Sequence, residues 1–339
     1  MASAAVEPST PGAPARAEFT PPRALRFVWI ALGLLIVAEA IHELFELGAY
    51  SALLDEWIPD AGVLFAACIC LARPLYTSRG RWPWLAFGAG LACWSAGSLL
   101  WSALYGSNPN PPYPTASDAL WLLWYPFTAL GVALLIRLRV TRFELHRWID
   151  GVAVMLIVLA GGFALVLQSV AEHTGQREFA TIVDFSYPVL DMILVGAILG
   201  VFGLMSWRPG KVWTLLGCGC VIIAVADAVS AVQEARGAVS AGNGYTFIWT
   251  TGAVLIAYAA WTPPAPARQA PQEMVGLRAV ALPLAVQLLA ALIQIYLLVS
   301  GREVSVADRV VTIAVLLIAS LQIVVSRPRG AESRQKTPP

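Results

Sequence analysis

Ten apolar stretches, each about as long as the hydrocarbon core of a bilayer is thick, occupy nearly the whole of this chain. A helix needs about 20 apolar residues to cross that core. Charged residues make up only 13% of the 339 positions, against about 25% in a typical soluble domain. The sequence therefore predicts an all-α, polytopic integral membrane protein with about ten transmembrane helices. The predicted spans are 25–47, 60–77, 83–105, 117–138, 149–170, 184–206, 212–234, 244–262, 278–300 and 306–326.

The basic residues predict the orientation of these spans, because cytoplasmic loops of membrane proteins carry an excess of lysine and arginine. With the N-terminus in the cytoplasm, 18 of the 22 lysines and arginines fall on the cytoplasmic side. Arginine and alanine are frequent and lysine is rare, which suggests a bacterial coding sequence rich in G and C. We expect a multi-pass protein of a bacterial cell (inner) membrane with both termini in the cytoplasm. The four basic residues on the outer side are Arg177, Arg236, Arg302 and Arg309.

Composition divides the chain into five segments. Residues 1–23 lack the apolar core of a signal peptide and are predicted to be a disordered cytoplasmic tail, as are residues 327–339. An eight-span membrane core is expected over 24–262. The Pro-rich stretch in 263–277 is predicted to be a cytoplasmic linker to a two-span hairpin at 278–326.

A weak internal repeat aligns the chain with itself at an offset of 129 residues. The first four spans would then repeat as spans five to eight in the same orientation, an arrangement known among membrane proteins. The glycines in this alignment have a second explanation, since glycine lets membrane helices approach closely, and the sequence leaves both explanations open. The matches are Trp84 with Trp213, Gly88 with Gly217, Gly90 with Gly219, Ser98 with Asp227 and, after a gap of one residue, Trp121 with Trp249.

Ionisable residues inside a span are costly unless they face a partner or water, so each is a candidate for function. Glu39, His42 and Glu43 lie in the outer half of the first span, where helical spacing brings them close together. The group is either a solvated turn at the membrane surface or a ligand or proton site. A single histidine beside carboxylates lacks a strong metal signature, and we predict neither a metal nor a cofactor.

Two further spans carry acidic and aromatic residues at their outer ends. Asp118, Trp121 and Tyr125 share one face of span 117–138, while Tyr187 and Asp191 lie in span 184–206. In both spans the tyrosine precedes a proline, which can kink a helix. An N-cap role favoured by the helix dipole is the main alternative explanation of Asp118, and the interfacial aromatic belt explains Trp121 equally well.

Asp227 and Asp191 lie deeper in their spans, and we predict that both belong to a buried polar network. We expect an outer cavity lined by spans 25–47, 117–138 and 184–206, because concave sites with a few placed polar groups are the usual binding sites. Carboxylates beside aromatic rings favour a cationic or hydroxylated ligand. The predicted ligand-binding residues are Glu39, His42, Glu43, Trp121, Tyr125, Tyr187, Asp191 and Asp227.

Three segments carry a family resemblance: PTASDALWLLWYPFTALGVALLIR (114–137), DGVAVMLIVLAGGFALVLQ (150–168) and DFSYPVLDMILVGAILGVF (184–202). They resemble the N-terminal multi-span sensory region of actinobacterial diguanylate cyclase and phosphodiesterase proteins of the GGDEF and EAL types. The resemblance implies a membrane region that senses an unknown signal and passes it to a cytoplasmic output domain. The sequence contains no GGDEF or EAL segment, so we expect the signal to pass to a separate partner.

The function we expect is a sensory or regulatory membrane module, with a small-solute transporter as the alternative. The sequence contains no nucleophile elbow, zinc-protease helix or phosphate-binding loop, so we do not expect an enzyme. A net charge of +1 gives no bulk field that would attract nucleic acid. The expected partners are the lipid bilayer, an unknown small ligand, and a cytoplasmic output protein or further copies of the chain.

Overall fold

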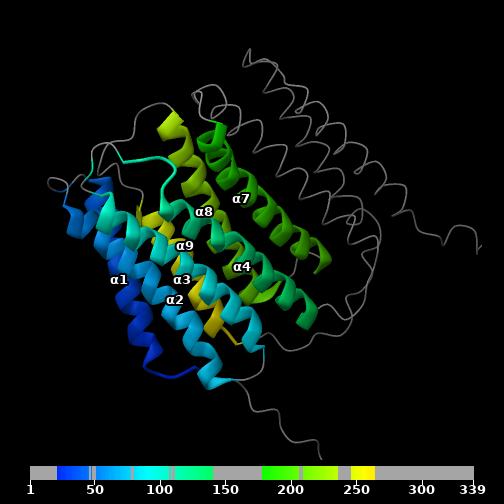
Figure 1. Cartoon of the computed structure of the whole chain (residues 1–339). Coiled ribbons are helices and arrows are strands. Elements are labelled where there is room, and N and C mark those ends of the chain that lie inside the picture. Colours follow the sequence, from blue (N-terminus) through cyan, green and yellow to red (C-terminus); the bar gives the residue numbers. More distant parts are fainter. Residues whose placement is uncertain are drawn as a thin grey trace, which may run out of the picture.

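The computed structural model describes residues 21–45, 47, 51–77, 80–106, 108, 111–139, 178–205, 209–235 and 246–263. Every regular element in these residues is a helix, which confirms the all-α class (Figure 1). The predicted spans 149–170, 278–300 and 306–326 lie outside the described residues, as do the linker beyond Pro263 and nearly all of both tails. The helices are α1 (Leu25–Leu44), the π-helical turn η1 (Leu53–Trp57) that leads into α2 (Ile58–Tyr76), α3 (Arg81–Leu104), α4 (Ala116–Arg139), α7 (Glu178–Leu204), α8 (Gly210–Ala235) and α9 (Thr246–Trp261).

Five of the described helices are long and apolar enough to cross a membrane, and two further apolar stretches are shorter. Their positions follow the predicted spans, because an apolar run that has to cross a bilayer folds as one uninterrupted helix. The span predicted at 60–77 is longer than expected, since η1 extends it at its start. The five segments are Leu25–Leu44, Leu53–Tyr76, Arg81–Leu104, Ala116–Leu138 and Gly210–Ala231, and the two shorter ones are Ser186–Phe202 and Thr246–Trp261.

Large apolar side chains face outward along α1. Phe27, Leu34 and Leu44 are 74%, 65% and 59% exposed. Exposed apolar surface costs about 25 cal/mol per Å² in water, but it costs nothing against lipid tails. The outward face of α1 therefore suits a bilayer and not an aqueous surface.

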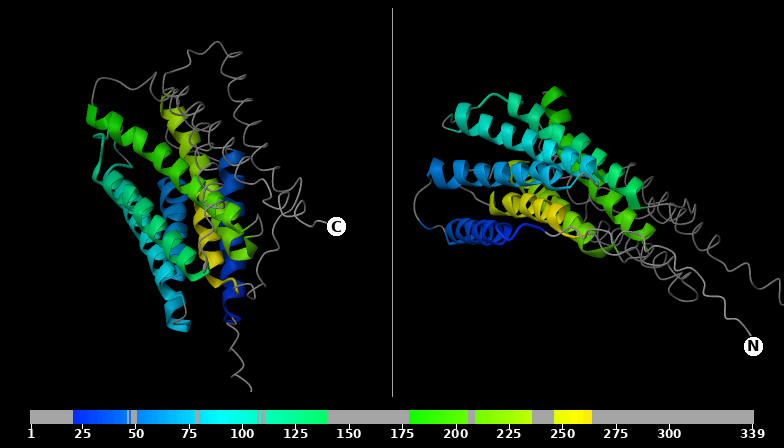
Figure 2. Two further views of the ribbon diagram at one scale, coloured as in Figure 1. Left: turned by 90° about the vertical axis from the view of Figure 1, so that its right-hand side faces the viewer. Right: turned by 90° about the horizontal axis from the view of Figure 1, so that it is seen from below.

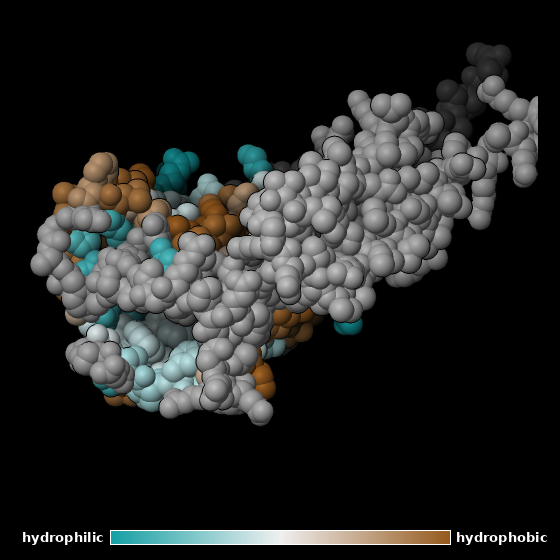
Figure 3. Space-filling model, turned by 90° about the horizontal axis from the view of Figure 1, so that it is seen from above, coloured by the Kyte–Doolittle hydropathy of each residue, from teal (hydrophilic) through white to brown (hydrophobic). Residues whose placement is uncertain are grey.

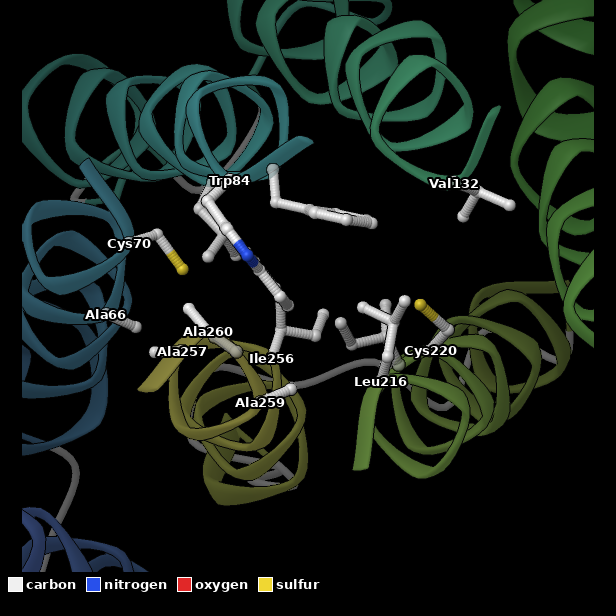
Figure 4. Close-up of a cluster of buried hydrophobic side chains, with 14 of the residues drawn as sticks. Ala66, Cys70, Trp84, Val132, Leu216, Cys220, Ile256, Ala257, Ala259 and Ala260 are labelled. Carbon is white, nitrogen blue, oxygen red and sulfur yellow. The ribbon is translucent and has the colours of Figure 1, made fainter. Parts of the chain in front are cut away.

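Six of the described helices form a closed ring. Going round it, α2 packs against α3, α3 against α4, α4 against α7, α7 against α8, α8 against α9, and α9 against α2. Figure 4 looks along the helices and shows the ring around its packed centre, and Figure 2 shows it from two further sides. Helix α1 lies outside the ring, against α9 and α2.

Apolar side chains from opposite parts of the ring fill its centre. Trp84 of α3, Leu216 of α8 and Ile256 of α9 point inward (Figure 4) and are almost completely buried. On the α2–α9 side the contact consists of small residues, including Ala66 and Ala257, both fully buried. Small side chains let helix backbones approach closely, so α2 and α9 pack tightly.

Glycine is required where α8 meets α9. A Cβ atom at Gly219 would lie 2.8 Å from the carbonyl oxygen of Gly252. A Cβ at Gly252 would in turn lie 2.9 Å from the carbonyl oxygen of Gly219 and 2.5 Å from Ile223. The two backbones are thus closer than any larger residue at these positions would allow.

Two glycines that are 129 positions apart, one in α3 and one in α8, each lie close to the preceding helix of the ring. A Cβ atom at Gly88 would lie 2.7 Å from Leu71 of α2, and one at Gly217 would lie 2.8 Å from Phe202 of α7. Gly88 and Gly217 are 129 positions apart, and α2 and α7 both precede the glycine helix in the ring.

The next pair of glycines faces the helix on the other side. A Cβ at Gly90 would lie 3.1 Å from Trp124 of α4. The glycine 129 positions later, Gly219, faces Gly252 of α9. The set α2, α3 and α4 (the first triplet) and the set α7, α8 and α9 (the second triplet) therefore share their order of neighbours and these glycine contacts.

Candidate functional site

The site begins at the N-terminus of α4, where Asp118 supplies the carboxylate half of a capping box. Thr115 precedes the helix, and its backbone N–H and hydroxyl donate to Oδ2 of Asp118 at 2.7 and 2.8 Å. A Thr–x–x–Asp sequence is typical of such a box, which satisfies backbone donors that the first helical turn leaves free. The expectation that Asp118 is the N-cap residue is wrong, because α4 begins at Ala116, so that Thr115 precedes the helix and Asp118 occupies the third helical position.

The second oxygen of Asp118 reaches across to α7. The hydroxyl of Tyr187 donates to Oδ1 of Asp118 at 2.8 Å. The ring of Tyr187 also lies edge-on to Tyr125 of α4, with the ring centroids 6.5 Å apart. The Tyr-Pro steps of α4 and α7 are therefore neighbours, and they lie where α4 meets α7, which is one of the two contacts between the first and second triplets.

Asp227 of α8 receives hydrogen bonds from two other helices. The indole N–H of Trp249 donates to its Oδ1 at 2.6 Å, and the hydroxyl of Tyr125 donates to its Oδ2 at 3.4 Å. The same hydroxyl lies 3.5 Å from the carbonyl oxygen of Tyr187. Tyr125 thus connects α4 with both α7 and α8.

Asp191 of α7 completes the group. Its side chain is 4% exposed, and its carboxyl group lies within hydrogen-bonding reach of the Asp227 carboxyl and of Tyr125. Its Oδ2 is buried and receives no hydrogen bond from a described donor. Two acidic side chains therefore face each other between α7 and α8, as predicted for a common polar network.

We call these six residues the acidic–aromatic cluster: Asp118, Tyr125, Tyr187, Asp191, Asp227 and Trp249. The cluster combines three carboxyl groups with two phenols and one indole, so it offers acceptors and ring faces suited to a cation or a hydroxylated molecule. Figure 3 shows the molecule from above, and hydrophilic and hydrophobic residues lie next to each other on the part of that face that is coloured. Among the described residues, no group of three histidine, cysteine or acidic side chains is arranged to hold a metal ion.

The acidic residues of α1 lie elsewhere. The carboxylate of Glu43 accepts hydrogen bonds from the hydroxyl of Thr246 and, at 3.4 Å, from the backbone N–H of Phe247. These are the first residues of α9, so Glu43 caps the positive end of that helix from outside. His42 lies 3.1 Å from Asp55 of η1.

Glu39 is the most buried acid of α1, with 5% of its surface exposed. It faces Thr250 of α9 and lies beside Glu43. Helix α1 packs mainly on α9 and α2, whereas α4 and α7 pack mainly on other helices of the ring, so α9 lies between the α1 acids and the acidic–aromatic cluster. The expectation that spans 25–47, 117–138 and 184–206 line one cavity is therefore wrong.

Trp121 also lies outside the cluster. Its indole N–H donates to the hydroxyl of Ser98 on α3 at 3.1 Å, and its ring lies 5.9 Å from that of Trp101. Conversely, the list of predicted site residues omitted Trp249, which is part of the cluster. The internal alignment that pairs Trp249 with Trp121 and Asp227 with Ser98 held the signal for this contact.

The sequence matches no protein-family model, and the comparisons with curated proteins and with solved structures gave no match.

Proposed function

We propose that the protein is a sensory or regulatory membrane module that binds a small cationic or hydroxylated ligand at the acidic–aromatic cluster and acts through a separate partner. One observation carries the proposal. Tyr125 from the first triplet meets Asp191 and Asp227 from the second triplet within one buried polar group. Structural needs explain Asp118, which caps α4, but they do not explain two carboxyl groups placed against each other.

A ligand at the cluster would contact both triplets, since α4 meets α7 there. A ligand shifts a conformational equilibrium only when it binds one arrangement better than another. A site built from two groups of helices meets this condition, because a change in their packing changes the site. This favours a receptor whose helices transmit the presence of a ligand to the cytoplasmic side.

The proposed membrane topology has ten spans with both termini in the cytoplasm. The distribution of basic residues supports it. Under this topology the acidic–aromatic cluster lies towards the outer face, so the ligand would arrive from outside the cell. The signal would then pass to a cytoplasmic output protein or to further copies of the chain, in line with the resemblance to sensory regions of GGDEF and EAL proteins.

We further propose that the first and second triplets are parallel repeats. The order of neighbours and the facing glycines support this, and so do two indole hydrogen bonds at matched positions, from Trp121 to Ser98 and from Trp249 to Asp227. If the triplets are repeats, the bond from Trp249 to Asp227 in the cluster corresponds to the bond from Trp121 to Ser98 in the first triplet, where the acceptor is a hydroxyl group.

A small-solute transporter is the second candidate. The same matched triplets favour it, because many transporters are built from repeats with the binding site at the interface between them. A buried pair of acids between helices is also the kind of group that membrane proteins use along ion and substrate pathways.

The test uses the full chain purified in detergent and its thermal unfolding in the presence of cationic, hydroxylated and anionic small molecules. A ligand at ten times its Kd should stabilise the protein by about 1.4 kcal/mol. We expect cationic or hydroxylated compounds to stabilise the protein in this way, and we expect the stabilisation to be smaller in the Tyr125→Phe variant. Asp60→Asn is a matched control, since Asp60 accepts its hydrogen bond from Ser102 away from the cluster.

A compound that passes this test then separates the two candidates. In proteoliposomes, a transporter should exchange the labelled compound across the membrane, and a receptor should bind it without exchange. If no compound class stabilises the protein, or if Tyr125→Phe and Asp60→Asn weaken binding equally, the cluster is not the ligand site.

A further inference from the structure

The contact between Asp191 and Asp227 needs a positive charge. Their carboxyl groups lie within hydrogen-bonding reach of each other. Two ionised carboxylates have only acceptor oxygens, so they repel and cannot form a hydrogen bond. Either a proton or another cation has to lie between them.

Among the residues that the structure describes, the neighbours of the pair do not supply that charge. The groups that the structure places against it are the hydroxyl of Tyr125 from α4 and the indole of Trp249 from α9. Tyr187 on α7 and Cys220 on α8 are the other titratable neighbours. All four side chains are uncharged in their ordinary forms. The carboxylate of Asp118 lies beyond Tyr187, to which it is hydrogen-bonded.

We infer that Asp191 and Asp227 share one proton, and that the ligand of the cluster is a cation that takes the place of this proton when it binds. The inference rests on the proposed function and names its ligand class. The proton leaves the hydrogen bond between the carboxyl groups and passes to water. Two carboxylates with one proton and two carboxylates with one monovalent cation carry the same net charge. The exchange therefore leaves no additional buried charge behind.

The surrounding rings favour an organic cation. The ring centroids of Tyr125 and Tyr187 are 6.5 Å apart, and the indole of Trp249 is hydrogen-bonded to Asp227. Aromatic faces attract quaternary and protonated amines within about 6 Å. The free Oδ2 of Asp191 is the acceptor that such a cation would contact.

The shared proton is tested with dicyclohexylcarbodiimide, which reacts with protonated carboxyl groups in apolar surroundings. The full chain in detergent is labelled, and the modified residue is found by peptide mass spectrometry. We expect label on Asp191 or Asp227. If the reagent labels other acidic residues but neither Asp191 nor Asp227, the inference of a shared proton is wrong.

The exchange is tested by competition with choline, tetramethylammonium and sodium ions. At ten times the Kd measured by thermal unfolding, a competing cation should lower labelling of the pair about tenfold. Dimethylbutanol, the neutral carbon isostere of choline, should have no effect at the same concentration. Asp60→Asn should leave the competition unchanged, whereas Asp227→Asn should weaken it.

The pH dependence of binding gives a second measure on the unmodified chain. If a cation displaces one proton, its apparent affinity falls about tenfold for each pH unit of acidification over the range in which the pair is protonated. A cation that stabilises the protein with no pH dependence and no effect on labelling would overturn the exchange and leave the proposed function standing. Binding of neutral hydroxylated compounds alone would likewise contradict a cationic ligand. Absence of binding by any compound would instead remove the proposed function.

Discussion

The indole N–H of Trp249 donates a 2.6 Å hydrogen bond to Asp227, and 128 positions earlier the indole of Trp121 makes the corresponding bond to Ser98 at 3.1 Å. The acceptor is a carboxyl group in the first bond and a hydroxyl group in the second. The two bonds allow the contribution of the acidic side chain to be measured against a reference within the same protein.

Trp249→Phe should therefore destabilise the protein more than Trp121→Phe. A hydrogen bond to a charged group contributes about 1.5–3 kcal/mol, and one between neutral groups about 0.5–1.5 kcal/mol. Thermal or denaturant unfolding of the two variants in the same detergent measures the difference. If both variants lose the same free energy of unfolding, Asp227 acts towards Trp249 as an ordinary neutral acceptor.

The loss of stability on replacing Asp227 should depend on whether the new side chain can accept hydrogen bonds. Asp227→Leu leaves the indole of Trp249 without its acceptor, at a cost of about 1–3 kcal/mol. Asp227→Asn keeps one carbonyl oxygen and should cost less. Unfolding measurements on both variants provide the test, and a leucine variant as stable as the asparagine variant would contradict it.

Glu43→Ala should destabilise α9 by about 1 kcal/mol, because the carboxylate caps the first turn of that helix. In a double-mutant cycle, Glu43→Ala and Thr246→Val should be coupled, since the Thr246 hydroxyl donates to Glu43. The control pairs Glu43→Ala with Thr262→Val, at the other end of α9, where the hydroxyl donates to Tyr258. That pair should be additive, and equal coupling in both cycles would argue against the cap.

Gly219→Ala should cost about 1–3 kcal/mol, because the new methyl group would overlap the backbone of α9. Gly33→Ala on α1 is the matched control, since its Cβ would meet nothing within 4 Å. Alanine favours the helix over glycine by about 0.8–1 kcal/mol, so this variant should be as stable as the wild type or more stable. Thermal or denaturant unfolding of both variants measures the two stabilities. An equal change in stability for Gly219→Ala and Gly33→Ala would contradict the close approach of α8 and α9.

The proposed topology predicts the sides of three loops. Reporter fusions after Arg142 and Arg329 should read as cytoplasmic, and a fusion after Asn108 as external, because of the distribution of basic residues. Fusion proteins active only on one side of the membrane measure this directly. A cytoplasmic reading at Asn108 would refute the assignment.

The sequence predicted the helices well because each one is a long apolar run whose ends carry polar or turn residues. The span expected at 244–262 is α9, Thr246–Trp261. The sequence also singled out Asp191 and Asp227, since acidic side chains deep in an apolar helix need a partner. Their role in binding a ligand remains a prediction.

The grouping of the acids was harder to predict. Helical periodicity shows that Glu39 and Glu43 share a face of α1, but it does not show which helix covers that face. That helix is α9, about 200 residues later in the chain. The order of helices in the ring depends on packing between distant segments, which helical periodicity does not reveal.

The ring of helices has two joints between its triplets, and they are unequal. Where α9 meets α2, buried alanines bring the backbones together, and Trp261 donates to the carbonyl of Ile69 at 3.0 Å. Where α4 meets α7, the rings of Tyr125 and Tyr187 keep the helices apart. The work of parting two helices grows with the number of atoms in contact, so the second joint separates at lower cost. We therefore expect the tyrosine pair, and not the α2–α9 contact, to mark the edge at which the ring would separate first.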